Sequence, residues 1–334
     1  MLALAHRRIP IVPRSLYALV NRVIIAPHQG YCAGVARAVE SVERALEIHG
    51  PPIYVRKQIV HNTHVVRDLE ARGAIFVEST GEVPRGARLV LSAHGVAPEV
   101  HREAADRDLA TIDATCPLVK KVHVEVRRFA DAGYCVILVG HPAPDEVVGT
   151  AGEAPGAVVV VETLQQARVV AVPDPERVAY VTQTTLSIDE TAEIIAALRE
   201  RFPTIVGPRK EDICYPTTNR QFAVKEMLAE IGVLLVIGSG NSSNSNRLVG
   251  TARTADVVSY LIEDETEIDE TWLEGVETVG LTSGASVPEK LLLRVCDWFR
   301  ERGVTEIGPT APRDEGVSFV LPVEVVRAPE QSAA

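Results

Sequence analysis

The chain has 334 residues, of which 46% are hydrophobic, 24% charged and 4% aromatic, as is typical of a globular protein with two or three domains. Its formal net charge of −11 at pH 7, with no basic block, argues against a nucleic-acid partner bound through the phosphate backbone. No apolar run reaches the roughly 20 residues that a membrane-spanning helix needs, so we expect no membrane partner either.

Residues 1–22 contain four arginines but no aspartate or glutamate. An arginine-rich, acid-poor start is typical of an organellar transit peptide, yet such peptides are also rich in serine, and only Ser15 stands here. We therefore expect residues 1–21 to be an extension ahead of a domain that begins near Arg22, in a cytoplasmic protein. Plastid-type targeting is the less favoured interpretation.

Short β-rich runs alternate with helical patterns along almost the whole chain. Over residues 33–49, for example, apolar side chains recur every three or four positions, which is the spacing of one helix face. The runs predicted to be strands are 23–26, 53–55, 75–77, 88–92, 111–114, 135–139, 157–161, 178–182, 205–206, 233–237, 257–261 and 278–281. The stretches predicted to be helices are 33–49, 62–72, the segment beginning near Pro117, 187–202, 217–231 and 288–302. This alternation predicts an α/β protein with mostly parallel sheets.

Three cysteines recur at comparable intervals, each just after an extended stretch and at or just before a helix start: Cys32, Cys116 and Cys214. Ligands collect at the carboxyl ends of parallel strands, so three similar modules could each deliver one thiol to a common centre. The modules, and a C-terminal tail that returns to the body, are expected to span residues 22–113, 114–212, 213–311 and 312–334.

The five cysteines are odd in number and far apart, unlike a disulfide framework. Cys135 and Cys296 lie in apolar stretches and are expected to be small buried hydrophobes. The other three stand at strand–helix junctions, where a helix N-terminus eases the ionisation of a thiol. Three thiolates can hold zinc or an iron–sulfur cluster, and the lack of a fourth would leave one metal with an open coordination position for catalysis.

Five short segments are rich in hydroxyl, amide, imidazole or glycine residues, and several follow predicted strands directly. They are residues 61–62, 92–95, 182–185, 241–244 and 283–286. Such side chains donate hydrogen bonds to a phosphate, and glycine lets backbone N–H groups approach it. The two histidines, His61 and His94, can add charge-assisted donors. One such segment alone is more often a simple turn, but five in one α/β chain favour a binding site for a phosphorylated ligand.

An acidic residue, Glu146, follows the predicted strand 135–139 within the segment 140–146. A carboxyl group at a strand end near a metal can relay protons. A single acidic residue in a loop more often lies on the solvated surface. Glu146 is therefore a candidate for proton transfer only because the three cysteines are also present.

Eight segments, in this order, resemble the 4-hydroxy-3-methylbut-2-enyl diphosphate reductases, the LytB-type iron–sulfur enzymes of isoprenoid synthesis. They read GYCAGVARAVE, VRKQIVHN, LSAHGV, DATCPLVKKVH, TQTTLS, FPTIVGPRKEDICYPTTNRQ, GSGNSSNSNRL and TSGASVPE. The similarity runs from about Arg22 to about residue 325. It implies three α/β modules around a central 4Fe–4S cluster, and an activity at the last step of the methylerythritol phosphate pathway.

The resemblance also implies roles by motif match. Cys32, Cys116 and Cys214 would bind the cluster and leave its apical iron open to the hydroxyl group of the substrate. Two electrons, from a donor such as ferredoxin or flavodoxin, and protons would then remove that hydroxyl as water, giving isopentenyl and dimethylallyl diphosphates. Glu146 would be the proton source, and Thr184 would lie near the substrate hydroxyl. The residues expected to hold the diphosphate are His61, His94, Ser242, Ser243, Asn244 and Ser286.

One position departs from the family pattern, which has a His-Pro-Glu triplet where this chain has Pro144, Asp145 and Glu146. Proline has no side-chain donor, and the loss of one charge-assisted hydrogen bond would weaken diphosphate binding by about 1.5–3 kcal/mol. His141, three residues earlier, is one candidate replacement. The departure leaves two hypotheses: a working reductase with a compensated pocket, which we favour, or a divergent paralogue with reduced activity or another allylic diphosphate as substrate.

Two further classes compete with this assignment. A nonenzymatic iron–sulfur redox sensor would need the three thiols but not Thr184, Glu146 or the polar segments. A zinc-dependent hydrolase with three cysteine ligands and a water would not need a diphosphate pocket. The joint presence of all these features favours the reductase over both.

Overall fold

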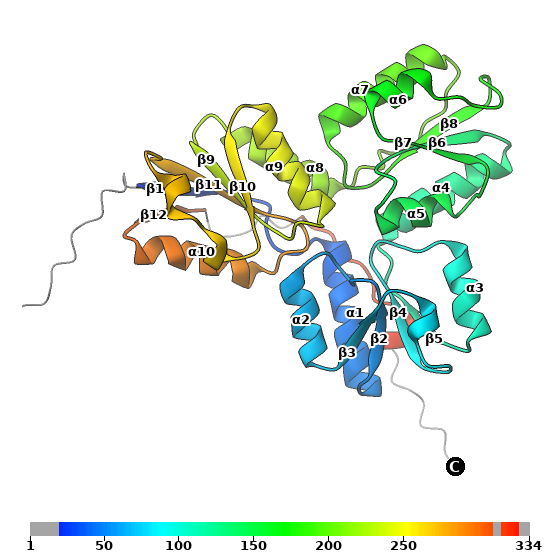
Figure 1. The fold of residues 1–334 in the computed structure, drawn as a ribbon, viewed down its shortest axis with the longest axis horizontal. Helices are drawn as coiled ribbons and strands as arrows, with labels where there is room; N and C mark the ends of the chain where they lie inside the picture. Colours follow the sequence, from blue (N-terminus) through cyan, green and yellow to red (C-terminus); the bar gives the residue numbers. More distant parts are fainter. Residues whose placement is uncertain (1–19, 310–314, 327–334) are drawn as a thin grey trace, which may run out of the picture.

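The computed structural model describes residues 20–309 and 315–326, so residues 1–19 of the expected extension and parts of the expected tail lie outside the described residues. Three sheets are formed, and every strand pair within them is parallel. Figure 1 shows the sheets, each with its own helices, as three bodies around a common centre. The predicted fold class, three α/β modules with parallel sheets, is confirmed.

The first module contains a four-stranded sheet of order β3-β2-β4-β5. Its strands are β2 (Ile53–Arg56), β3 (Ala74–Val77), β4 (Arg88–Leu91) and β5 (Ala110–Asp113). Its helices are α1 (Ala33–His49), α2 (Thr63–Ala71) and α3 (Pro98–Asp106), with the 3-10 turn η1 (Thr80–Glu82). Both faces of the sheet are apolar, since Val90 of β4 packs in one core cluster and its neighbours Leu89 and Leu91 pack in another.

The second module contains a three-stranded sheet of order β7-β6-β8. Its strands are β6 (Cys135–Val139), β7 (Val158–Val161) and β8 (Val178–Thr182). Its helices are α4 (Pro117–Asp131), α5 (Asp145–Ala151), α6 (Leu164–Val169) and α7 (Ile188–Arg201). Ile137 of β6 faces one core cluster and Leu138 the other, so this sheet is also covered on both sides, as parallel sheets require.

The third module contains a five-stranded sheet of order β10-β9-β11-β1-β12. Its strands are β1 (Arg22–Ile25), β9 (Val233–Ile237), β10 (Val258–Ile262), β11 (Thr278–Ser283) and β12 (Glu306–Gly308). Its helices are α8 (Tyr215–Met227), α9 (Ser243–Thr254) and α10 (Glu289–Glu301), with the 3-10 turns η2 (Glu265–Glu267) and η3 (Glu270–Leu273). The central strand β9 is buried at every residue.

β1 is the first strand of the chain, yet it lies between β11 and β12 in the sheet of the third module. Val23 pairs with Val279 on one side and with Ile307 on the other. The first expected module thus begins with a strand that belongs to the third sheet. The local pattern identifies this strand but not its partners, because those partners lie at the other end of the chain.

Several elements are absent from the predicted set: α3, α5, α6, α9, β12 and a helix at residues 323–326. α5 has seven residues and α6 has six, too few to display a helical period. The predicted strand 205–206 is an isolated bridge between Val206 and Ala179. The predicted helix 217–231 begins two residues earlier, at Tyr215, and ends at Met227.

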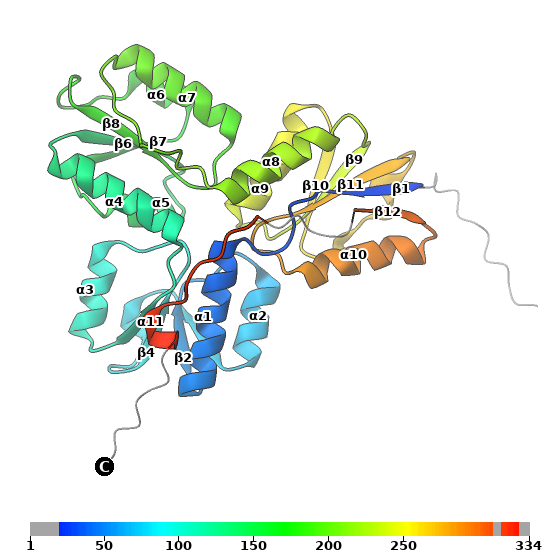
Figure 2. The same cartoon turned by 180° about the vertical axis from the view of Figure 1, so that it is seen from behind.

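The described part of the C-terminal tail, residues 315–326, runs from the third module along α1 to the first module (Figure 2). It ends in α11 (Val323–Val326), whose Val325 is buried in a core cluster of the first module. The carbonyl of Val320 accepts a hydrogen bond of 2.7 Å from Nε of Arg37 on α1. The tail therefore connects two modules. Among the described residues, no helix is both long and apolar enough to cross a membrane.

Candidate active site

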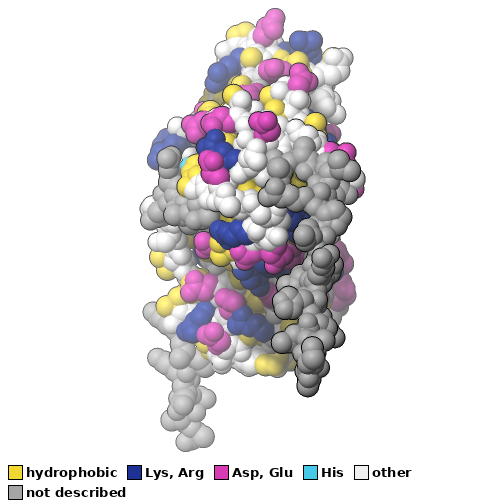
Figure 3. Space-filling view, turned by 90° about the vertical axis from the view of Figure 1, so that its left-hand side faces the viewer, with side chains coloured by type: hydrophobic (Ala, Val, Ile, Leu, Met, Phe, Trp, Pro, Cys, Tyr) yellow, Lys and Arg dark blue, Asp and Glu magenta, His cyan; other side chains and the backbone are white. Residues whose placement is uncertain are grey.

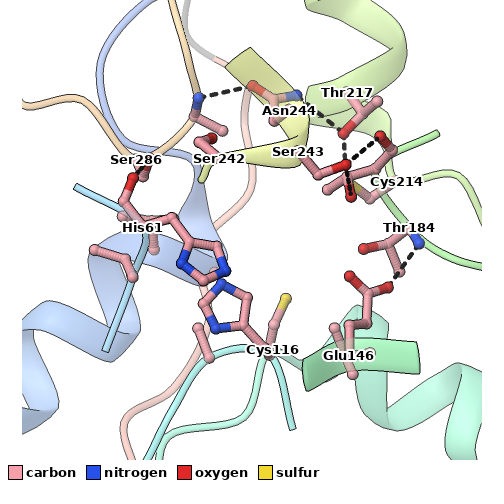
Figure 4. Close-up of a pocket in the computed structure, with 18 of the residues that line it drawn as sticks. His61, Cys116, Glu146, Thr184, Cys214, Thr217, Ser242, Ser243, Asn244 and Ser286 are labelled. Carbon is pink, nitrogen blue, oxygen red and sulfur yellow. Dashed lines mark hydrogen bonds between the residues drawn. The ribbon is translucent and has the colours of Figure 1, made fainter. Parts of the chain in front are cut away.

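One cavity lies where the three modules meet, and loops that follow the carboxyl ends of their strands line it. Every predicted site residue contributes to its lining: Cys32, His61, His94, Cys116, Glu146, Thr184, Cys214, Ser242, Ser243, Asn244 and Ser286. Figure 4 shows many of these side chains converging on the same space from different elements. The sequence therefore identified residues that are far apart in the chain and adjacent in the fold.

The three cysteines occupy equivalent positions, because each is the N-cap residue of a helix: Cys32 of α1, Cys116 of α4 and Cys214 of α8. The Sγ of Cys214 lies 3.2 Å from Oγ1 of Thr217. Gly34, in the first turn of α1, lies so close to Cys116 that a side chain at this position would collide with it. An added Cβ would lie 2.6 Å from Sγ of Cys116 and 3.9 Å from Sγ of Cys32. This glycine leaves the space that a group bound by both thiols would need.

Burial decides the protonation of these thiols. It raises the pKa of Cys32, that of Cys116 to about 11 and that of Cys214 to about 12. The sequence predicted easier ionisation at helix N-termini, and this was wrong for the protein part alone, since loss of hydration outweighs the hydrogen bonds from backbone N–H groups of the first helical turn. Buried thiols of this kind become thiolates when a metal cation supplies the compensating charge.

The spacing of the donors bears on which metal group would fit. Among the described residues, no three Cys, His, Asp or Glu side chains stand close enough to hold a single metal ion. A larger group that reaches three separated thiols, as an iron–sulfur cluster does, fits the donor chemistry and the space beside Gly34.

Two histidines form one wall of the cavity. The rings of His61 and His94 stack, with centroids 4.1 Å apart and planes 24° from parallel. Burial lowers the pKa of His61, which Asp145 partly opposes, and it lowers the pKa of His94 well below the ordinary value. Both rings are therefore neutral donors before an anion arrives, rather than the charged donors that the sequence predicted.

The start of α9 forms the opposite wall. Ser242 is its N-cap residue and accepts a hydrogen bond of 3.3 Å from the backbone N–H of Ser245. Asn244 accepts one of 2.9 Å from the N–H of Ala285 and donates one of 3.2 Å to Thr217. Because backbone N–H groups at a helix N-terminus favour anions, this wall suits a phosphate group. The segment 241–244, predicted as a loop, is thus partly helical.

Ser286 and Ser243 join the modules around the same space. The hydroxyl of Ser286 donates a hydrogen bond of 2.9 Å to the carbonyl of His61, which connects the third module to the first. Ser243 and Thr185 contact each other through their hydroxyls at 3.0 Å, which connects the third module to the second. Hydrogen bonds therefore connect the third module to both other modules around the cavity.

Glu146 stands in the first turn of α5 rather than in a loop. Its side chain is directed into the cavity (Figure 4), although only 6% of the residue is exposed. Its Oε1 accepts a hydrogen bond of 2.7 Å from the backbone N–H of Thr184. Burial raises the pKa of Glu146, with the bond from Thr184 opposing it. The residue is therefore suited to hold a proton beside the cavity.

Pro144 is the N-cap residue of α5 and lines the cavity, so the departure from the family pattern lies within the site. His141 does not replace it. Nδ1 of His141 lies 3.0 Å from Glu162 and its Nε2 contacts Arg247, and the residue is not part of the lining. Its ring joins the second module to α9 instead.

Sequence reasoning missed two residues beside the cysteines. Thr217 contacts both Cys214 and Asn244, and its place three residues after the cysteine was the available signal. Arg220 is 1% exposed, and it donates hydrogen bonds to the carbonyls of Gly30 and Pro216 at 2.9 and 3.2 Å. It thus joins the first turn of α8, directly after Cys214, to the loop that leads to Cys32, and it pairs with Glu315 of the tail at 3.4 Å.

The fold and this cavity define a class: an α/β protein of three parallel-sheet modules that gathers three thiols, a carboxyl group and donors for an anion into one central site. Within that class, the chain belongs to the LytB protein family, whose sequence model matches residues 23–300. Enzymes of this family are iron–sulfur oxidoreductases.

Named relatives agree with the family. The chain is 55% identical over 308 residues to the 4-hydroxy-3-methylbut-2-enyl diphosphate reductase of Acidothermus cellulolyticus, which covers 92% of this chain and 91% of that protein. It is 53% identical over 315 residues to the enzyme of the same name from Streptomyces avermitilis, with 94% and 93% covered. Among solved structures, the E-1-hydroxy-2-methyl-but-2-enyl-4-diphosphate reductase of Plasmodium falciparum matches with a TM-score of 0.86 and 37% identity, covering 92% of this chain and 97% of that chain.

Proposed function

We propose that this chain is a 4-hydroxy-3-methylbut-2-enyl diphosphate reductase, which removes the allylic hydroxyl of its substrate at the last step of the methylerythritol phosphate pathway. The observation that carries the proposal is the convergence of three N-cap cysteines, donors for a diphosphate and one buried carboxyl on a single cavity. Relatives that share more than half of their residues with it, over nine-tenths of its length, bear this enzyme's name.

Cys32, Cys116 and Cys214 would hold a 4Fe–4S cluster and leave one iron without a protein ligand. When bound, the cluster supplies the electrons and an open iron position for the substrate hydroxyl. The overall change consumes two electrons and two protons: the C–O bond breaks, a C–H bond forms and the oxygen leaves as water. The chain's own residues supply binding, orientation and protons.

The diphosphate would lie between the two walls of the cavity. The N-terminus of α9, with Ser242, Ser243 and Asn244, offers hydroxyl, amide and backbone donors to one side of it. His61 and His94 face it from the other wall, and the anion would raise the pKa of both rings by favouring their charged forms. Binding energy at this remote, unreactive end fixes the position of the hydroxyl at the other end of the substrate.

Glu146 would supply the proton that converts the departing hydroxyl into water. Burial raises its pKa, which favours the protonated carboxyl, and the bond from Thr184 fixes the direction of the carboxyl. The side-chain hydroxyl of Thr184 would lie beside the substrate hydroxyl. This division leaves Thr184 as the orienting residue and Glu146 as the general acid.

We further infer a cytoplasmic enzyme that receives electrons from a ferredoxin or flavodoxin. Such carriers are acidic, so docking would need a basic area near the site. On the face in Figure 3, the coloured basic and acidic side chains are interspersed. Docking on that face would therefore depend on individual pairs rather than on one broad patch.

The test is anaerobic reconstitution of the full chain with iron and sulfide, followed by oxidation of reduced methyl viologen on addition of 4-hydroxy-3-methylbut-2-enyl diphosphate. We expect a brown protein with about four irons per chain, and turnover that depends on the substrate. Cys116→Ser should lose the cluster, whereas the matched control Cys135→Ser, in β6 outside the cavity, should keep it. An intact cluster without turnover of this substrate would favour the paralogue that uses another allylic diphosphate.

A further inference from the structure

A basic residue follows each of the three cysteines on the same helix. It comes five residues after Cys32 and Cys116 and six residues after Cys214. Side chains on a helix lean toward its N-terminus, which is where each cysteine stands. None of these basic residues lines the active-site cavity, and the proposed reaction does not use them. We call them the bridging cations: Arg37 on α1, Lys121 on α4 and Arg220 on α8.

The guanidinium group of Arg37 reaches the segment that leads into Cys116. Its Nη1 donates a hydrogen bond of 3.1 Å to the carbonyl of Thr115, the residue directly before Cys116. Its Nη2 donates one of 3.3 Å to the carbonyl of Asp113. Because Cys32 is the N-cap residue of the helix that carries Arg37, these bonds fix the spacing between Cys32 and Cys116.

The ammonium group of Lys121 reaches the segment that leads into Cys214. Its Nζ donates hydrogen bonds of 2.6 and 3.0 Å to the carbonyls of residues 210–211. It donates another of 2.8 Å to Oδ1 of Asp212, two residues before Cys214. Cys116 is the N-cap residue of the helix that carries Lys121, so these bonds fix the spacing between Cys116 and Cys214.

Arg220 completes the set. Its Nη2 donates a hydrogen bond of 2.9 Å to the carbonyl of Gly30, two residues before Cys32. Arg220 stands on the helix that Cys214 caps, so this bond fixes the spacing between Cys214 and Cys32. The three bridges therefore run from the first cysteine to the second, from the second to the third and from the third back to the first.

The backbone of each cysteine is held independently of these bridges. Each cysteine N–H donates a hydrogen bond to the carbonyl of a residue that lines the cavity. The pairs are Cys32 with Ala285 at 3.1 Å, Cys116 with Ala93 at 2.9 Å and Cys214 with Thr184 at 3.0 Å. Loss of one bridging cation therefore loosens one spacing and leaves these backbone bonds in place.

The charges of the bridging cations are balanced differently. Lys121 pairs with Asp212 at 2.8 Å, and Arg220 pairs with Glu315 at 3.4 Å. Arg37 is only 8% exposed, yet within the described part of the chain its hydrogen bonds all go to backbone carbonyls. A buried charge normally has a partner of opposite sign. Three thiolates that hold a cluster would bring negative charge to this side of α1.

We propose that Arg37, Lys121 and Arg220 are positioning residues for the iron–sulfur cluster of the proposed function, on which this inference rests. Each fixes the spacing of one pair of cysteines, so the metal-free chain already presents its thiols at the separations that the cluster needs. The charge of Arg37 has a second effect, because a positive charge stabilises a cluster more after it gains an electron than before. Reduction adds that electron and changes no bond at these residues.

Lys121→Met tests the positioning role, because it removes the bonds to the segment before Cys214 and keeps a long side chain. We expect the reconstituted full chain to lose iron to a chelator at least about tenfold faster than the wild type. Lys121→Arg, which keeps the charge and several donors, should recover most of the difference. The matched control is Arg201→Met, since Arg201 also donates to two backbone carbonyls, at residues 168 and 170, outside the cavity lining.

The control variant should release iron at the wild-type rate, and the metal-free form of Lys121→Met should still show cooperative thermal unfolding. Iron release at the wild-type rate in Lys121→Met would overturn the positioning role. Equally fast release in Arg201→Met would also overturn it, because any lost bridge to a carbonyl would then have the same effect.

Arg37→Gln tests the charge, since glutamine is neutral but keeps an N–H donor. Redox titration of the reconstituted cluster with dithionite should give a more negative midpoint potential than in the wild type. Arg37→Lys, which keeps the charge, should stay close to the wild-type potential, and so should Lys121→Met. An unchanged potential in Arg37→Gln, or an equal shift in Lys121→Met, would overturn the role given to the charge of Arg37.

Failure of this inference can be told apart from failure of the proposed function. A wild-type chain that takes up no cluster would overturn both. A wild-type chain that holds the cluster and reduces the substrate, while Lys121→Met and Arg37→Gln match it in iron release and in midpoint potential, would overturn this inference alone.

Discussion

Thr184 and Glu146 are joined by a hydrogen bond of 2.7 Å from the backbone N–H of one to Oε1 of the other. The bond connects the loop after β8 to the first turn of α5, so two neighbouring segments of the second module hold one carboxyl group in place. Both residues are buried and both line the cavity. The side-chain direction of Glu146 is therefore set before any ligand binds, which is the preorganisation expected of a general acid.

The variant Glu146→Gln should remove the acidic proton of this side chain while keeping the side chain in its position. Its amide oxygen can still accept the hydrogen bond from Thr184, whereas the amide has no acidic proton to give. We expect full cluster content and substrate affinity within about twofold of the wild type, with turnover reduced at least about 100-fold. Methyl viologen oxidation and anaerobic substrate titration measure the two properties. An active Glu146→Gln enzyme would remove this residue from the mechanism.

Substrate binding should take up protons. Burial lowers the pKa of His61 and of His94 in the free protein, and a bound diphosphate raises both by stabilising the charged rings. Between the free and bound values, binding adds protons, so affinity should fall as pH rises, by up to about tenfold per pH unit for each proton. Calorimetry in buffers with different ionisation enthalpies counts these protons. His94→Asn should lower the count, and an unchanged count would contradict the assignment.

Pro144→His should strengthen diphosphate binding. The residue lines the cavity at the N-cap of α5, so an imidazole there adds one charge-assisted donor, worth about 1.5–3 kcal/mol or roughly ten- to 100-fold in affinity. Pro142→His is the matched control, since it lies in the same loop outside the lining. KM and the dissociation constant report the effect. If Pro144→His gives no gain, the pocket is already complete without a histidine.

Gly34→Ala should reduce cluster binding while the metal-free protein still folds. Alanine favours a helix over glycine by about 0.5–1 kcal/mol, but its Cβ would lie 2.6 Å from Sγ of Cys116. The metal-free variant can relieve that contact by rotation of the Cys116 side chain, so we expect an unfolding temperature close to that of the wild type, and we expect the reconstituted variant to hold much less iron. Gly250→Ala, in α9 with no atom within 4 Å of the added Cβ, should keep its iron. Normal iron in Gly34→Ala would argue against a group bound at these thiols.

The sequence predicted the site better than it predicted the pairing of the strands. Cys32, Cys116 and Cys214 could be found because each sits in a recognisable segment at a helix start, and the same segments carry the polar side chains that line the cavity. The three-module α/β fold followed from the alternation of strands and helices. These features depend on residues that are close together in the chain, so the sequence pattern alone can reveal them.

Other features depend on contacts between distant segments, and the sequence could not supply them. The N-cap position of Pro144 and the helical place of Glu146 were missed because α5 is too short to show a period. Arg220 was missed because two of its three partners, Gly30 and Glu315, come from distant parts of the chain. The neutral state of His94 was missed because burial, which lowers its pKa, is a property of the packed structure.

The position of β1 has a consequence for how the protein is made. This strand leaves the ribosome first, but its neighbours in the sheet, β11 and β12, are translated near the end. Cys32 follows β1 closely and its loop is held by Arg220, which pairs with Glu315 in the tail. The first thiol can therefore take its place only when almost the whole chain has been synthesised. Until then β1 is an unpaired strand, and the proposed cluster, which needs all three thiols, would be inserted only after that point.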